Sequence, residues 1–224
     1  YKNTDQSPTT ASNRVVTITT MTDNGGTVGA GDDSAALTIA ATVTVASADD
    51  NPTIAASDNT GAVTEDSGTT TATDTLVGSD VDGTDTLTWS CTSCADDGST
   101  QSLTGTYGTW VLVESTGQWT YTIDNSDTDT NALSAGGATP TDTLTAVLSD
   151  GAGDTASITV TVTLTGANDL PTTSTPTAQS ATEETSFTGY ATSDFPFTDV
   201  DSGDTALTSI TITVVESSGD LEKS

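Results

Sequence analysis

The sequence predicts an all-β protein built from tandem sandwich domains, and three observations support this prediction. Threonine, which favours strands, accounts for 54 of the 224 residues, whereas strong helix formers are sparse. Apolar and polar residues alternate over several stretches, such as residues 35–46 and 156–165. An acidic motif also recurs after roughly the length of one sandwich domain.

The repeat is specific in its residues. An Asp-x-Asp pair, a third aspartate and a Thr/Leu run occupy residues 80–88 and return 119 positions later at residues 199–207. Two further segments repeat nearly in step: residues 64–67 match 182–185 at an offset of 118, and residues 50–52 match 169–171 at an offset of 119. This period is too long for one turn of a solenoid and fits one whole sandwich domain.

The strands are assigned in order along the chain. Residues 14–22 and 35–46 are predicted to be the last two strands of one domain, closed by the junction at residues 49–52. The next domain has seven predicted strands and one helical turn at residues 130–135; the strands are residues 61–65, 70–77, 84–90, 106–114, 117–124, 141–149 and 156–165. Seven short strands separated by turns are typical of an immunoglobulin-like sandwich.

Three units follow from this assignment. Residues 1–52 are expected to be the end of one repeat, residues 53–171 a complete sandwich, and residues 172–224 the start of another repeat. Neither partial unit can bury its apolar face alone, so each needs a missing half from a longer chain or from a neighbouring molecule. A longer array of repeats is the favoured source, with a discrete polymerising subunit as the alternative.

The charge of the chain narrows its partners. There are 32 acidic residues against three basic ones, a formal charge of −29, which disfavours binding to nucleic acid or to anionic lipid. Of the acidic residues 26 are Asp and six are Glu. Because Asp prefers turns and offers a short carboxylate, this bias suits loops that bind a hard cation. No stretch of about 18 apolar residues is present that could span a membrane.

The middle unit resembles a known repeat family through several short segments. Residues 61–171 look like a VCBS-type repeat of large bacterial RTX-type surface adhesins, on the segments at residues 63–68, 105–110, 117–125, 148–151 and 166–171. The flanking units are similar to cadherin-like adhesin repeats. The resemblance implies extracellular stalks of tandem sandwiches on the bacterial surface, stiffened by Ca²⁺ between domains.

Calcium is therefore the expected cofactor, with a solvated acidic turn as the alternative for each loop. Asp-x-Asp-x-x-Asp offers oxygens at alternating positions, and Ca²⁺ takes six to eight of them. By similarity to cadherin-like junctions, the first junction is expected to use Asp49, Asp50, Asn51, Asp80, Asp82 and Asp85. The second is expected to use Glu65, Asn168, Asp169, Glu183, Asp199, Asp201 and Asp204.

Cys91 and Cys94 are the only cysteines. Without histidine the pair cannot complete a tetrahedral zinc site, and no helix follows it as in a redox-active Cys-x-x-Cys motif. A disulfide that closes a small loop is the expected state in an extracellular chain.

An enzyme is not expected. The chain has no histidine, and its aspartates lie in repeated junction loops rather than around one cleft. Trp110, Trp119 and Tyr121 could form a sugar-binding platform, but their alternation favours core packing.

The leading hypothesis is a structural segment of an extracellular bacterial adhesin or fibre that mediates cell adhesion or biofilm formation. Its partners would be neighbouring copies or repeats of the same protein, end to end. The alternative is a module that binds a glycan or protein receptor of the host or matrix.

Overall fold

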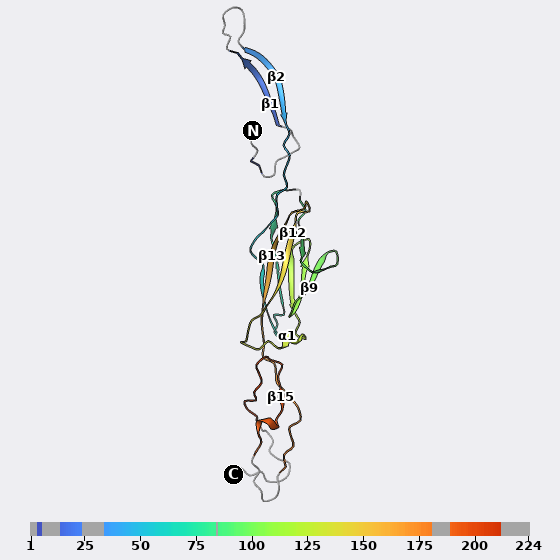
Figure 1. The fold of residues 1–224 in the computed structure, drawn as a ribbon, viewed down its shortest axis with the longest axis vertical. Coiled ribbons are helices and arrows are strands. Elements are labelled where there is room, and N and C mark those ends of the chain that lie inside the picture. Colours follow the sequence, from blue (N-terminus) through green and yellow to red (C-terminus); the bar gives the residue numbers. More distant parts are fainter. Residues whose placement is uncertain (1–3, 6–13, 24–33, 84, 181–188, 212–224) are drawn as a thin grey trace, which may run out of the picture.

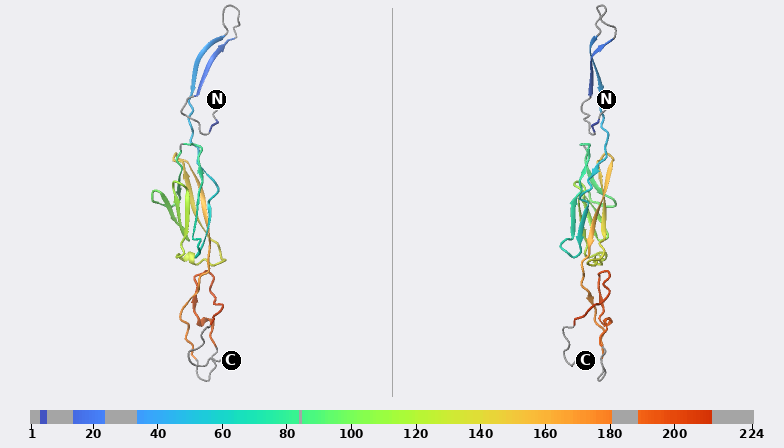
Figure 2. Two further views of the ribbon diagram at one scale, coloured as in Figure 1. Left: turned by 180° about the vertical axis from the view of Figure 1, so that it is seen from behind. Right: turned by 90° about the vertical axis from the view of Figure 1, so that its left-hand side faces the viewer.

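The computed structural model describes residues 4–5, 14–23, 34–83, 85–180 and 189–211. These residues form three parts in line: a β-hairpin, a central sandwich, and a segment that contains a short strand pair (Figure 1). The same linear order is visible from behind and from the side in Figure 2. Among the described residues, no helix is long and apolar enough to span a membrane.

The central sandwich has two sheets, which confirms the predicted all-β fold. The four-stranded sheet has the order β4 (Thr60–Thr64), β13 (Thr155–Thr165), β12 (Thr141–Ser149), β7 (Thr88–Cys91). The five-stranded sheet has the order β5 (Thr71–Thr75), β11 (Gln118–Ile123), β10 (Gly108–Val113), β9 (Thr100–Thr104), β8 (Ala95–Asp96). Strand β4 runs parallel to β13, and the other pairs are antiparallel.

The core lies between the two sheets and follows the alternation of the sequence. Leu144, Ala146 and Leu148 on β12 are fully buried, whereas the residues between them are not. Opposite them lie Trp110 and Trp119, also fully buried, with ring centroids 5.8 Å apart. The aromatic residues are therefore core residues as predicted, and they form no exposed platform for a sugar.

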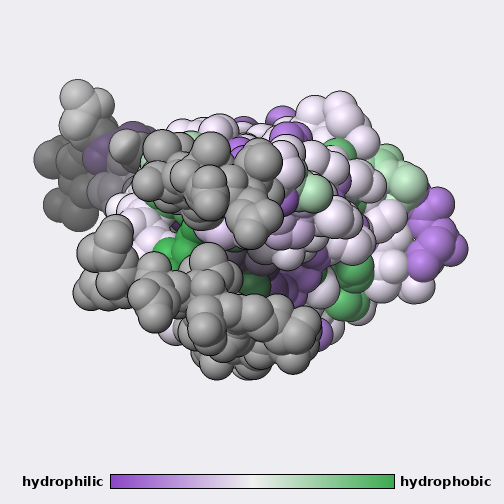
Figure 3. All heavy atoms as spheres, turned by 90° about the horizontal axis from the view of Figure 1, so that it is seen from below, coloured by the Kyte–Doolittle hydropathy of each residue, from purple (hydrophilic) through white to green (hydrophobic). Residues whose placement is uncertain are grey.

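Elsewhere the surface is rich in threonine and aspartate. Seen along the long axis from the C-terminal end, the described surface is mostly hydrophilic or neutral, with scattered apolar side chains (Figure 3). This agrees with a solvated exterior around the buried core of the sandwich.

Three elements differ from the prediction. The strand expected at residues 84–90 begins only at Thr88, because residues 85–87 belong to the acidic loop. The hairpin of β8 and β9 was not predicted, since its strands are short and polar and show no apolar alternation. This hairpin projects sideways from the sandwich (Figure 2). The helical turn exists as α1 (Thr128–Asn131), slightly earlier than expected, because the Asp127 carboxylate accepts a hydrogen bond from the Asp129 N–H and caps it there.

The start of the sandwich and the start of the C-terminal segment have the same structure. Strand β3 (Thr53–Ile54) pairs with β6 (Gly78–Ser79), and β14 (Thr172–Thr173) pairs with β15 (Phe197–Thr198). Thr53 pairs with Ser79, and Thr172 pairs with Thr198. Each residue of the second pair lies 119 positions after its counterpart in the first. A short 3₁₀ turn, η1 (Thr192–Asp194), precedes β15.

The N-terminal hairpin resembles the end of the sandwich. Strands β1 (Arg14–Thr22) and β2 (Ser34–Val43) pair antiparallel, as β12 and β13 do. Ile39 and Val43 lie 119 positions before Ile158 and Val162, which contribute to the sandwich core. In the hairpin no second sheet is packed on this face within the described residues, and Ile18 and Ile39 remain 42% and 50% exposed.

Candidate metal centre

Carboxylates gather at both ends of the sandwich, where it meets the flanking parts. We call these places the first junction and the second junction. The first junction contains Asp49, Asp80, Asp82, Asp85, Asp150 and Asp154, and the second contains Glu65, Asp169, Asp199, Asp201 and Asp204. No basic residue lies in the sequence between Arg14 and Lys223, so the sandwich has no cationic side chain of its own to neutralise them.

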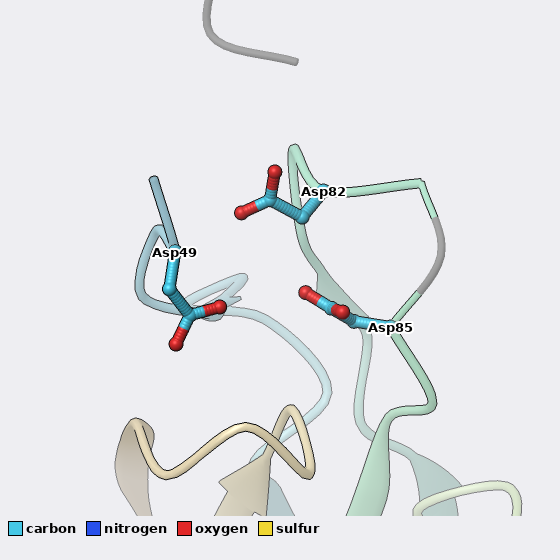
Figure 4. A group of neighbouring side chains, drawn as sticks. All are labelled: Asp49, Asp82 and Asp85. Carbon is cyan, nitrogen blue, oxygen red and sulfur yellow. The ribbon is translucent and has the colours of Figure 1, made fainter. Parts of the chain in front are cut away.

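At the first junction, the linker meets the Asp-x-Asp loop that follows β6. Carboxylate oxygens of Asp49, Asp82 and Asp85 lie within 4.8 Å of one another (Figure 4). Two hydrogen bonds fix the loop: the Asp50 N–H donates to Asp82 Oδ2 at 2.9 Å, and the Asp82 N–H donates to Asp80 Oδ1 at 2.8 Å. Asp50 therefore contributes its backbone to this arrangement.

Asp150 and Asp154 were missed by the sequence analysis. They lie in the turn between β12 and β13, and an oxygen of each lies within 4.8 Å of an Asp49 carboxylate oxygen. Asp150 is 2% exposed, and its Oδ1 accepts hydrogen bonds from the N–H groups of Ala152, Gly153 and Asp154. The spacing Asp-Gly-x-Gly-Asp was the available signal, because two glycines allow a tight turn that brings both carboxylates to one end.

The second junction repeats the geometry of the first. The Asp169 N–H donates to Asp201 Oδ2 at 2.8 Å, and the Asp201 N–H donates to Asp199 Oδ1 at 3.0 Å. Each of these bonds lies 119 positions after its counterpart at the first junction. Carboxylate oxygens of Asp199, Asp201 and Asp204 lie within 4.8 Å of one another.

Glu65 is the contribution of the sandwich to the second junction. It is 1% exposed, and its Oε2 accepts a hydrogen bond from the Ala167 N–H at 3.2 Å. Burial raises the pKa of its carboxyl group, and the charges of the neighbouring Asp169 and Asp201 raise it further. Asp66, next to Glu65, also belongs to this electrostatic environment, which the sequence analysis did not anticipate.

The remaining predicted ligands have different positions. Asn51 is exposed, and Asn168 is also exposed while donating its side-chain amide to the Asp169 carbonyl at 2.6 Å. Asn168 lines a cavity at the second junction together with Asp169, Asp199 and Asp204. Glu183 lies outside the described residues.

Unsatisfied oxygens are concentrated at the two junctions. Among the described residues, eight buried side-chain polar atoms lack a hydrogen-bond partner, and six of them are junction carboxylate oxygens. They belong to Asp80, Asp85 and Asp150 at the first junction and to Glu65, Asp169 and Asp201 at the second. Because a buried carboxylate oxygen without a partner is costly, these atoms fit a bound cation.

The electrostatics agree with this distribution. Burial is the main cause that raises the pKa of the Asp49, Asp85, Asp169 and Glu65 carboxyl groups, and neighbouring carboxylates raise each of them further. Asp150 differs: burial opposes its ionisation, but the backbone N–H groups that bond to it lower its pKa. Each junction therefore accumulates negative charge that the protein itself does not neutralise.

The two cysteines lie away from both carboxylate clusters. Cys91 and Cys94 are joined by a disulfide with a Cα–Cα distance of 5.6 Å, at the point where β7 leads into the β8–β9 hairpin. Gln101 supports the same corner, since its side-chain oxygen accepts a hydrogen bond from the Cys91 N–H at 2.7 Å. The bridge thus anchors the base of a side projection.

The fold and its acidic ends define a β-sandwich protein with carboxylate clusters at both ends of the sandwich. A family model described as a bacterial cadherin-like domain matches residues 49–166, which is more than half of the chain. The chain belongs to this family. Cadherin-like domains are adhesion-type structural modules of surface proteins and are typically not enzymes.

Among solved structures, the chain is similar to the crystal structure of human CDH23 EC21-23, at 20% identity and a TM-score of 0.42. The similarity covers 74% of this chain and 51% of the human one, so the chain spans about half of that structure. No curated protein matches the chain.

Proposed function

We propose that this chain is a structural segment of an extracellular bacterial adhesin or fibre, in which calcium ions at the junctions stiffen a row of cadherin-like modules. The observation that carries the proposal is the set of six buried, unsatisfied carboxylate oxygens, three at each junction. A hard cation with six to eight oxygen ligands is the partner that such a donor set suits.

The residues that would hold the ion can be named. At the first junction they are Asp49 from the linker, Asp80, Asp82 and Asp85 from the acidic loop, and Asp150 from the β12–β13 turn. At the second they are Glu65, Asp169, Asp199, Asp201 and Asp204. Calcium would neutralise these charges and cross-bridge segments that belong to different modules.

The receptor-binding alternative has less support. A sugar platform would need exposed aromatic side chains, but Trp110, Trp119 and Tyr121 are fully buried. A position outside the cell, in a surface fibre or biofilm matrix, is part of the structural proposal, and it is supported by the family and by the Cys91–Cys94 disulfide.

A single substitution tests the first junction. Asp85→Asn removes one charge from the cluster but keeps the size of the side chain. Without calcium, this variant should be at least as stable as the wild type, because it relieves repulsion from Asp82 and Asp80. With calcium, it should gain less stability than the wild type. Thermal unfolding with calcium and with EGTA measures both effects.

Asp74→Asn is the matched control, since Asp74 is exposed on β5, outside both carboxylate clusters. The control should respond to calcium like the wild type. An Asp85→Asn variant that keeps the full calcium response would contradict the assignment of Asp85 as a ligand.

The partners in this proposal are neighbouring copies or repeats of the same protein. Support comes from the β1–β2 hairpin, whose register places Val16 beside Ala41 and Ile18 beside Ile39 on one apolar face. In the sandwich, the face with the corresponding pattern packs against the second sheet, where Val160 and Val162 are fully buried and Ile158 is partly buried. Within the described residues, the hairpin therefore has the form of a module end without its other half.

Sedimentation velocity tests this partner. The chain should associate as its concentration rises, and Ile18→Asp should weaken the association by placing a charge on the apolar face. Thr17→Asp, one position along and on the opposite face, should have a smaller effect. A chain that stays monomeric over the whole concentration range would rule out neighbouring copies as the occupant.

A further inference from the structure

A second contact joins the sandwich to the C-terminal segment at the second junction, and it uses no carboxylate. The Ser202 N–H donates a hydrogen bond to the Ala132 carbonyl at 3.1 Å. In return, the Ser134 hydroxyl donates to the Ser202 carbonyl at 2.5 Å. One residue of the following module is thus held through both of its backbone polar groups.

The sandwich side of this contact is already ordered. Leu133 packs against the core, and its N–H donates to the Thr130 carbonyl at 3.0 Å. Thr130 is fully buried and donates its hydroxyl to the Tyr107 carbonyl at 3.1 Å. Gly166 completes the seat, because a Cβ at this position would lie 2.0 Å from the Leu133 carbonyl oxygen.

The partner side is a turn that holds its own shape. The Asp201 N–H bonds to Asp199, and the Asp204 N–H donates to the Asp201 carbonyl at 3.3 Å. Gly203 has a φ of +106°, a backbone conformation that residues other than glycine rarely adopt. Ser202 also lines a small cavity with Asp129, Ala132, Leu133, Ser134, Gly137 and Ala138, so the turn is seated between these loops.

We propose that the basal surface formed by residues 132–134 is a docking surface for the first acidic turn of the following module, and that it sets the orientation of that module independently of any cation. The surface binds the backbone N–H and carbonyl of Ser202, and its occupant is the turn of residues 199–203 of this chain. Because Ser202 is adjacent to Asp201, the same turn has one side for docking and one side for carboxylates. The inference adds to the proposed function a contact that does not depend on calcium.

Distance measurements between spin labels on the full chain test this proposal. Labels at Thr143→Cys on β12 and Ser193→Cys in η1 report the orientation of the two parts, and both sites are exposed. In EGTA, Ser134→Ala should broaden the distance distribution, because loss of one hydrogen bond lowers the ratio of docked to undocked molecules roughly two- to ten-fold. The Ser202 amide should lose protection from hydrogen exchange by a similar factor.

Ser157→Ala is the matched control, since Ser157 is an exposed serine on β13, and it should leave both readouts unchanged. If Ser134→Ala matches the wild type in EGTA in both readouts, the proposal is wrong. If instead the calcium proposal is wrong, the result is different. Calcium then narrows the distance distribution of neither the wild type nor Ser134→Ala, but the two proteins still differ from each other in EGTA.

Discussion

Removal of calcium is expected to lower the melting temperature by about 10 °C or more and to reverse the pH dependence of stability. An ion that binds only the folded state stabilises it by about 2.7 kcal/mol per site at 100 times its dissociation constant. For a domain of about 120 residues, each kcal/mol shifts the melting temperature by roughly 4 °C. One site therefore corresponds to a shift of about 10 °C, and calcium bound at both junctions should give a larger shift in melting temperature.

The sign of the pH dependence follows from the pKa directions. Without calcium, the pKa values of Asp49, Asp85, Asp169 and Glu65 are raised above their usual values of 3.8 and 4.5. These groups contribute to the stability of the folded protein fully at a pH below their usual pKa values. This contribution is lost as the pH rises through their raised pKa values in the folded protein. The calcium-free protein should thus become less stable as the pH rises above about 4.5, and the net charge of −29 acts in the same direction.

The opposite slope is expected with calcium. The ion binds the deprotonated carboxylates, so protons compete with it and stability should rise over the same range of pH. Below pH 3.8, both samples should lose stability, because hydrogen bonds from Thr100 and Ser99 lower the pKa of Asp97 to about 2. The calcium-free protein should therefore have its maximum near pH 4.

Calorimetry measures both the shift in melting temperature and the slope of stability with pH. The ionic strength is held fixed, with sodium replacing calcium, so that the general screening of charge is the same in both samples. If the calcium and EGTA samples have the same melting temperature and the same slope between pH 4.5 and 7, calcium is not the cofactor of these junctions.

Much of this architecture was predictable from the sequence because it depends on local patterns. The alternation of residues 156–165 gave strand β13 and its buried face, and the Asp-x-Asp repeat gave the loops that hold Asp82 and Asp201. Both signals lie within a few residues of the structure that they specify.

The rest depends on contacts between distant segments. Asp150 and Asp49 are about 100 positions apart in sequence, and only the closure of the sandwich brings the β12–β13 turn to the linker. The contact between Ser202 and Ala132 also joins distant segments, and neither residue type indicates a partner in the sequence. The β8–β9 hairpin was missed for another reason: its register depends on β10, and its own residues show no periodicity.

The buried Asp142 is expected to be among the most sensitive positions in the sandwich. It is 6% exposed at the start of β12, and its carboxylate accepts three hydrogen bonds: from the N–H groups of Thr106 and Tyr107, at 3.1 and 3.0 Å, and from the Tyr121 hydroxyl at 2.7 Å. It thereby joins the two sheets at the base of the core. Burial, and then the bond to Asp142, raise the pKa of Tyr121, so the phenol remains a donor.

Asp142→Ala should lower the free energy of unfolding by about 3 kcal/mol, because it leaves one buried donor, the Tyr121 hydroxyl, and two partly buried backbone N–H groups without their acceptor. Tyr121→Phe should cost less, since the carboxylate keeps its two backbone donors. The double variant should show a coupling of about 0.5–3 kcal/mol, as expected for residues in direct contact. Urea unfolding with a comparison of slopes separates loss of stability from a change in the unfolded state.

The same substitution should act on the second junction. Tyr107, which donates to Asp142, accepts hydrogen bonds through its carbonyl from the Asp124 N–H and the Thr130 hydroxyl. These bonds hold the loop that carries α1 and the Ala132–Ser134 seat. Asp142→Ala should therefore reduce the hydrogen-exchange protection of the Ser202 amide under conditions where the sandwich is still folded. Thr143→Ala, at the exposed neighbouring position on β12, should leave the protection of that amide unchanged. If the two variants have equal effects on the Ser202 amide, the hydrogen bonds of Asp142 do not support the second junction.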